Sequence, residues 1–241
     1  MTMRTKLEQT DSPVRSIMAA TTEPTAKRKS RKKPSPQRRV SQIPGLHDIC
    51  VFCGSGTGKN PAYSAAAKLF GRTMAEAGVG LVYGGGSLGL MGDVARAVLE
   101  HGGYVTGIIP SFLSERERML TDVNELIVTQ DMHERKRLMF ERSDAFVALP
   151  GGIGTLEELI EQLTWSQLGR HEKPIVLANI EGFWNPLKVL LDHMRVEAFI
   201  RPGLDVRFTI VDTADVILPA VADAVARAAP ISVDSSVPDK F

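Results

Sequence analysis

Short apolar runs alternate with amphipathic segments along most of this chain, and this alternation is the feature that most restricts its fold. The apolar runs predict strands at residues 49–53, 80–83, 105–109, 126–129, 145–149, 174–179 and 208–211. The segments between them have helical spacing, at residues 62–77, 88–101, 133–142, 155–168, 186–195 and 214–228. Strands that alternate with helices predict a parallel sheet covered by helices on both faces. The expected fold class is therefore α/β, with a doubly wound, Rossmann-like sheet in a single domain.

Charge is divided unevenly along the chain. The first 45 residues contain 11 Lys and Arg against 3 Asp and Glu, whereas the rest contains 18 against 25. The basic run 27–39 cannot build a core, so we predict a disordered basic tail over residues 1–45. The predicted domain covers residues 46–230, and a short C-terminal tail covers residues 231–241. The charge of the basic tail suits contact with nucleic acid, but a solubilising extension is the simpler interpretation and the one we favour.

Cysteine and histidine usage argues against a disulfide or a metal centre. Cys50 and Cys53 lie on one predicted strand, where residues three apart point to opposite faces. The five histidines are scattered and have no ligand spacing, so we expect no metal. We expect no cofactor either. The small number of cysteines indicates a reducing cytoplasm. The apolar stretch 16–20 is too short for a signal peptide or a membrane span, so no membrane association is predicted.

Three predicted strands end in glycine-rich segments, at residues 53–58, 83–92 and 149–158. In an open parallel sheet, ligands bind beyond the carboxyl ends of the strands. We therefore expect the functional site to lie where these segments meet.

The second segment matches the pattern G-x-G-x-x-G at Gly84, Gly86 and Gly89, with a strand before it and a helix after it. A dinucleotide site would need an acidic residue where the next strand ends, but that strand ends at Pro110 without one. We favour contact with the phosphate or ribose of a mononucleotide. The alternative, that the glycines serve only tight turns and packing, remains open. The expected contacts in the first two segments are Ser55, Gly85, Gly86 and Ser87.

The third segment, Pro-Gly-Gly-Ile-Gly-Thr-Leu-Glu-Glu at residues 150–158, predicts a second anion-binding loop. Its expected contacts are the backbone of Gly151, Gly152 and Gly154 and the hydroxyl of Thr155. It lacks the Gly-Lys-Ser/Thr ending of a triphosphate-binding loop. The spacing of Thr155 and Glu158 also matches a capping box, so a purely structural role for Glu158 remains open.

The segment Met-His-Glu-Arg-Lys-Arg at residues 132–137 begins a predicted helix. Arg135 and Arg137 are two positions apart, so they cannot share one face of that helix. A basic run of this kind is usually solvated. However, this helix leads into the strand that ends at residue 149, so its side chains could approach the third glycine-rich segment.

The segments at residues 132–136 and 150–158 together resemble the Lonely Guy (LOG) family of cytokinin riboside 5′-monophosphate phosphoribohydrolases. Further matching motifs are Val-Phe-Cys-Gly-Ser at 51–55, Tyr-Gly-Gly-Gly-Ser at 83–87 and Thr-Trp-Ser-Gln-Leu-Gly at 164–169. The resemblance spans roughly residues 48–200. It implies that Arg135 and Glu158 are the catalytic pair. It also implies substrate contacts by Glu117, Lys136, Gly152, Gly154, Thr155 and Thr164.

The resemblance implies hydrolysis of the N-glycosidic bond of a purine nucleoside 5′-monophosphate to free base and ribose 5-phosphate. AMP and N6-modified adenosine monophosphates are the expected substrates, and a homodimer is the expected assembly. The sequence departs from the family's pattern at Gly56, Ile153 and residues 111–122, which bears on base selectivity. Relatives are sometimes labelled lysine decarboxylases, but no lysine here has a pyridoxal-phosphate-like setting. The alternative function is a non-catalytic nucleotide or cofactor carrier on the same fold.

Overall fold

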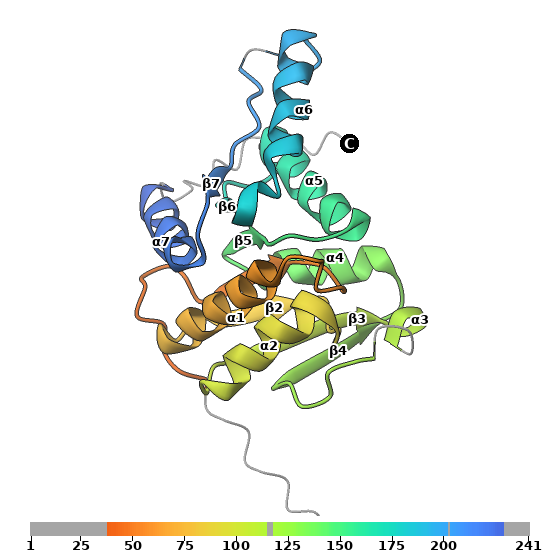
Figure 1. The fold of residues 1–241 in the computed structure, drawn as a ribbon, viewed down its shortest axis with the longest axis vertical. Helices are drawn as coiled ribbons and strands as arrows, with labels where there is room; N and C mark the ends of the chain where they lie inside the picture. The colour runs from red at the N-terminus through yellow and green to blue at the C-terminus, as the bar shows by residue number, and fades with distance from the viewer. Residues whose placement is uncertain (1–37, 115–117, 202, 229–241) are drawn as a thin grey trace, which may run out of the picture. The chain divides into compact units, whose positions relative to one another are not determined.

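The chain forms a single sheet of seven strands in the order β4-β3-β2-β1-β5-β6-β7 (Figure 1). This computed structural model describes residues 38–114, 118–201 and 203–228. Each paired strand is parallel to its neighbour. The strands are β1 (Asp48–Phe52), β2 (Gly80–Tyr83), β3 (Val105–Pro110), β4 (Glu125–Thr129), β5 (Ala145–Ala148), β6 (Ile175–Ala178) and β7 (Thr209–Val211). The predicted parallel sheet and its strands are confirmed.

Helices connect the strands at the predicted places. They are α1 (Pro61–Glu76), α2 (Gly89–Glu100), α4 (Met132–Glu141), α5 (Ile153–Gln167), α6 (Asn185–Val196) and α7 (Ile217–Arg227). Three short elements were not predicted: α3 (Ser111–Ser114) and the 3₁₀ helices η1 (Ile180–Gly182) and η2 (Ala214–Val216). Local capping explains two of the helix starts. The side chain of Asn60 accepts from the backbone of Ala62, and that of Asp131 accepts from Glu134.

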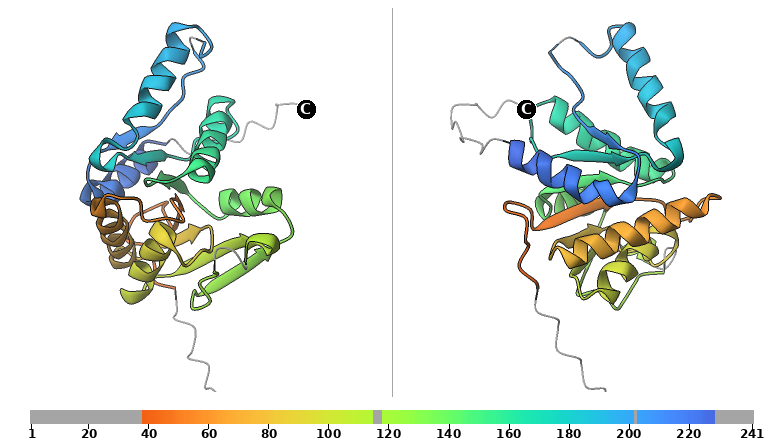
Figure 2. Two further views of the ribbon diagram at one scale, coloured as in Figure 1. Left: turned by 45° about the vertical axis from the view of Figure 1, so that its right-hand side comes forward. Right: turned by 60° about the vertical axis from the view of Figure 1, so that its left-hand side comes forward.

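The helices divide into two layers, each with its own apolar core (Figure 2). Side chains of α1, α2 and α7 form one core with alternate residues of the sheet, centred on Phe70 and Val94. Side chains of α4, α5 and α6 form the other core, with Phe146 and Trp184. The central strands are buried along their length, whereas the two edge strands β4 and β7 are only partly buried. Burial on both faces explains why the central strands are almost continuously apolar.

The two cysteines follow this division, as predicted. Cys50 belongs to the core under α4, α5 and α6, and Cys53 belongs to the core under α1, α2 and α7. Both are free thiols. Burial raises the pKa of each thiol, so both remain protonated at neutral pH.

The two tails lie mostly outside the described residues, since residues 1–37 and 229–241 are not described. Residues 38–45, which the prediction assigned to the basic tail, are described and contact the domain. Arg38 pairs with Asp48 and lies over the ring of Tyr104, and the backbone of Gln42 donates to Ala77. No described helix is both long and apolar enough to cross a bilayer.

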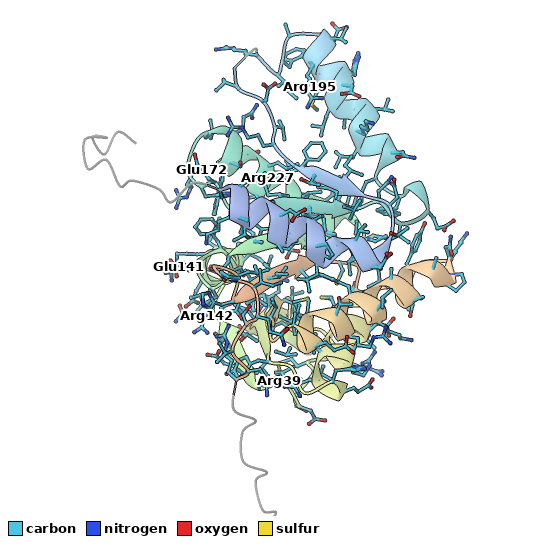
Figure 3. All side chains as sticks on the ribbon, turned by 90° about the vertical axis from the view of Figure 1, so that its left-hand side faces the viewer. Arg39, Glu141, Arg142, Glu172, Arg195 and Arg227 are labelled. Carbon is cyan, nitrogen blue, oxygen red and sulfur yellow. The ribbon has the colours of Figure 1, made fainter. Side chains whose placement is uncertain are left out.

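Charged residues are grouped at the amino-terminal edge of the sheet, where the helices end. Glu141 and Arg142 lie at the end of α4, Arg227 ends α7, and Glu172 precedes β6 (Figure 3). Arg142 and Glu125 form an ion pair of 2.8 Å at this edge. The glycine-rich segments lie at the opposite edge.

Candidate functional site

The strand order changes direction between β1 and β5, and two glycine-rich loops meet at this point. The backbone of Gly54, after β1, donates to the carbonyl of Pro150, after β5, at 3.1 Å. The carbonyl of Gly54 in turn accepts from the backbone of Leu90 in α2 at 3.0 Å. All three glycine-rich segments therefore lie together at the carboxyl edge, as expected for a ligand site of this fold.

Arg135 is buried beside these loops and is held from several directions. Its Nε donates to the carbonyl of Ile108 in β3 at 3.1 Å, and its Nη1 lies 2.8 Å from Oε1 of Glu158. Gly84 leaves space for it, because a Cβ at that position would overlap Nη2 of Arg135. The two side chains of the ion pair are only 8% and 11% exposed. A buried ion pair loses much of its hydration, so it needs close geometry and further hydrogen bonds of this kind.

Glu158 lies in the second turn of α5, and the start of that helix tests whether Glu158 belongs to a capping box. The residue that caps α5 is Gly152, and Thr155 is already inside the helix. Thr155 therefore cannot form the capping box, and that interpretation is wrong. The carboxylate of Glu158 is instead directed to Arg135.

Lys136 also reaches α5, where it contacts two carboxylates. Its Nζ lies 2.7 Å from Glu157 Oε1 and 2.9 Å from Glu161 Oε1. Burial alone would lower the pKa of Lys136, but the hydrogen bonds to the two carboxylates outweigh it, so the pKa is raised. Arg137 points to solvent and pairs with Glu141, which confirms that Arg135 and Arg137 diverge.

The loop between β5 and α5 presents its backbone to open space. A Cβ on Gly152 or Gly154 would meet nothing within 4 Å, and both residues are exposed. Gly151 differs, because a Cβ there would overlap the buried side chain of Thr155. The first amides of a helix have no partner within that helix, so the exposed start of α5 can offer backbone donors to an anion.

The loop between β2 and α2 is covered by the backbone of residues 118–120, which the sequence did not indicate. The backbone of Ser87 donates to the carbonyl of Arg118 at 3.0 Å, and the carbonyl of Gly85 accepts from Leu120 at 3.1 Å. Gly86 forms an isolated antiparallel bridge with Met119. Gly85 and Gly86 are buried, whereas Ser55 in the neighbouring loop is exposed.

Two predicted contacts are not gathered with the others. Glu117 lies outside the described residues. Thr164 is exposed on α5, and its hydroxyl donates to the carbonyl of Ile160 at 2.7 Å. It follows Thr155 by nine residues, which is about 14 Å along a helix. Within one chain, Thr164 is therefore remote from the exposed amides of the loop.

Three features of the site were missed by the sequence analysis. They are the carbonyl of Ile108 that holds Arg135, the segment 118–120 over the second loop, and the contact between Lys136 and Glu161. Only the last has a signal in the sequence. Glu157 and Glu161 are one turn apart on the predicted helix, on a face that a cation could bridge.

Comparisons with known proteins agree with this arrangement. A family model described as "possible lysine decarboxylase" matches residues 91–221. The cytokinin riboside 5′-monophosphate phosphoribohydrolase LOG7 of Arabidopsis thaliana is 50% identical over 154 residues, covering 64% of this chain and 71% of the relative. LOG3 of the same plant is 51% identical over 154 residues, covering 64% and 72%.

Among solved structures, the Moco carrier protein of Chlamydomonas reinhardtii has a TM-score of 0.56 at 23% identity, over 75% of this chain and 98% of its own. This likeness supports the fold alone. The identity of about 50% to the phosphoribohydrolases extends over most of their length, and the family model matches more than half of this chain. The chain therefore belongs to the Lonely Guy (LOG) family.

Proposed function

We propose that this protein hydrolyses the N-glycosidic bond of purine nucleoside 5′-monophosphates, releasing free base and ribose 5-phosphate. The observation that carries the proposal is the buried pair of Arg135 and Glu158 beside the exposed amides of Gly152 and Gly154. The relatives that are about 50% identical are named for this activity on cytokinin ribosides. We therefore propose AMP and N6-modified adenosine monophosphates as substrates, the latter matching the relatives' names.

The site has two regions of different charge, one suited to the ribose of the substrate and the other to its 5′-phosphate. Around the pair, three carboxylates (Glu157, Glu158, Glu161) surround two cations (Arg135, Lys136), so this region carries a net negative charge. It stabilises the positive charge that develops on the ribose as the bond to the base breaks. The start of α5 lacks acidic residues in its first turn and offers backbone donors, so we assign the 5′-phosphate to this loop.

In the proposed reaction, the bond between C1′ and the base breaks and a water oxygen bonds to C1′. Glu158 accepts a proton from that water, and the base leaves with a proton from solvent. Arg135 fixes the orientation of the carboxylate through the 2.8 Å contact. Binding of the remote phosphate contributes to the chemical step, so a nucleoside without it should react poorly.

A homodimer is part of the proposal, because it would bring Thr164 to the site. Ile153, Ile160 and Leu168 are exposed on one side of α5, with Thr164 among them. A two-fold axis near Ile160 would place the partner subunit's Thr164 beside the start of α5. Light scattering should show a dimer for the wild type and a monomer for Ile160→Glu, and an active wild-type monomer would contradict this part. We also propose a reducing cytoplasm as the location, because the chain has only two cysteines.

The direct test is incubation with AMP, N6-isopentenyladenosine monophosphate, GMP and CMP, with free base detected by chromatography. We expect base release from the adenine nucleotides and loss of most turnover in Glu158→Gln. Glu172→Gln is the matched control, because Glu172 is exposed at the opposite edge of the sheet (Figure 3). Absence of base release from all four nucleotides would overturn the proposal.

A further inference from the structure

Long charged side chains connect α4 to α5, and Lys136 makes two of these contacts. Its ammonium has three donors, and two carboxylates of α5 take up two of them at 2.7 and 2.9 Å. The side chain is only 14% exposed.

We infer that Lys136 and Glu161 are positioning residues, which hold α4 at the distance from α5 that joins Arg135 to Glu158. Arg135 and Lys136 are consecutive on α4, and Glu158 and Glu161 are three apart on α5, so the two contacts lie side by side. The contact between Lys136 and Glu161 therefore restricts how far Arg135 can lie from Glu158. This inference rests on the proposed function, because it assigns these residues a role in the same site.

One carboxylate oxygen of Glu161 is buried, which makes the contact of the other oxygen with Lys136 important. Its Oε2 is buried and accepts no hydrogen bond from the described residues, so Lys136 at Oε1 is the cation that balances it. Lys136, Glu158 and Glu161 line one small enclosed space together with Phe52, Met139 and Gln162. Without Lys136, the carboxylate of Glu161, one oxygen of which is buried, would have no cation beside it in the described part of the chain. The contact that holds α4 against α5 would then be lost, and the neighbouring contact between Arg135 and Glu158 would be disturbed.

The test is a double-mutant cycle on AMP hydrolysis with Lys136→Met, Glu161→Gln and the double variant. We expect each single variant to lower kcat by about tenfold, with KM changed by less than about threefold. The double variant should be no slower than Lys136→Met, because both act through one contact. Lys136→Arg keeps the charge and should recover most of kcat.

The matched control is the ion pair of Arg137 and Glu141 on the same helix, which is 3.2 Å long and well exposed. Arg137→Met, Glu141→Gln and their double variant should leave kcat within about twofold, as expected of exposed pairs. Urea unfolding of both cycles gives a second measurement that does not depend on activity. The coupling free energy between positions 136 and 161 should exceed that between positions 137 and 141.

Three results would overturn the inference. One is a raised KM with unchanged kcat and a lost preference for AMP over adenosine, which would make Lys136 a phosphate contact. The second is independent, additive losses in the double variant. The third is a urea cycle without coupling between positions 136 and 161. If the wild type releases no base, the proposed function fails instead, and the urea cycle still decides whether the two residues act together.

Discussion

The loop after β2 and the loop after β5 have similar glycine-rich sequences, but their glycines are required for different physical reasons. In the loop after β2 and the first turn of α2, added side chains would overlap neighbouring atoms: Arg135 at Gly84, the backbone of Ser55 at Gly89, and the carbonyl of Ser87 at Gly92. In the loop after β5 and the first turn of α5, Gly152 and Gly154 face open space. The segment after β2 thus uses glycine to assemble the edge of the sheet, and the segment after β5 leaves its backbone open to a ligand. A shared motif therefore does not imply a shared role.

The largest expected effect is on folding, from Gly89→Ala. Gly89 has a φ of +58°, which is unfavourable for alanine, and a Cβ would overlap the backbone of Ser55. We expect the free energy of unfolding to fall by about 3 kcal/mol, as measured by urea denaturation. Gly56→Ala is the control, since a Cβ there would meet nothing within 4 Å. If both variants are equally stable, close packing does not require glycine at position 89.

Gly84→Ala should affect turnover more than stability. The added methyl group would displace the guanidinium of Arg135 from its place between Ile108 and Glu158. Because small displacements of reacting groups are costly, we expect kcat for AMP to fall by about a hundredfold. Steady-state kinetics and a thermal melt on the same sample separate the two effects. A variant that hydrolyses AMP at the wild-type rate would remove Gly84 from the site.

Gly154→Ala should have opposite effects on stability and on substrate binding. Gly154 lies within α5, where alanine is favoured over glycine by up to about 1 kcal/mol, so the variant should unfold at slightly higher urea. The methyl group would occupy the space in front of the exposed amides, and KM for AMP should rise by about tenfold. An unchanged KM would mean that the phosphate binds elsewhere and that Gly154 does not leave space for a ligand.

The smallest expected effect lies at the far end of α5, away from both loops. His171 is buried against Phe140 and Phe146, and its Nε2 lies 3.2 Å from the carbonyl of Gln162. Burial lowers the pKa of His171 below its usual value in the folded protein. The unfolded chain therefore takes up this proton first, and stability should decline as the pH falls below about 6.5.

Urea midpoints between pH 7.5 and 5.5 would measure this decline. His171→Gln should reduce the slope of stability against pH, whereas His133→Gln, at an exposed position on α4, should leave it unchanged. If the His171 variant keeps the full slope, other groups cause the acid sensitivity.

The sheet could be predicted from the sequence because the alternation of apolar runs and amphipathic helices is a local pattern. Strand β2 was predicted to the residue, and β1 and β5 to within one residue. The start of α5 was placed two residues late, because Thr155 and Glu158 imitate a cap, whereas the actual cap, Gly152, has no side chain. The resemblance named Arg135 and Glu158, and the structure brings them together.

The partners of the site residues could not be predicted, because they come from distant parts of the chain. Arg135 is held by a backbone carbonyl of β3, and a carbonyl has no signature in the sequence. Ser87 is engaged by Arg118 through backbone atoms alone. Lys136 was assigned to the substrate by resemblance, but its neighbours on α5 depend on how two helices approach each other.

The position of α4 in the strand order has a consequence for how a newly made chain becomes active. α4 connects the edge strand β4 to β5, which lies beside β1 in the middle of the sheet. Arg135 therefore precedes β5 in the chain and Glu158 follows it, so their contact spans the point where β5 pairs with β1. A partly synthesised chain holds the arginine without its carboxylate. The pair therefore needs both halves of the sheet, and we expect a chain cut short before α5 to cleave no nucleotide.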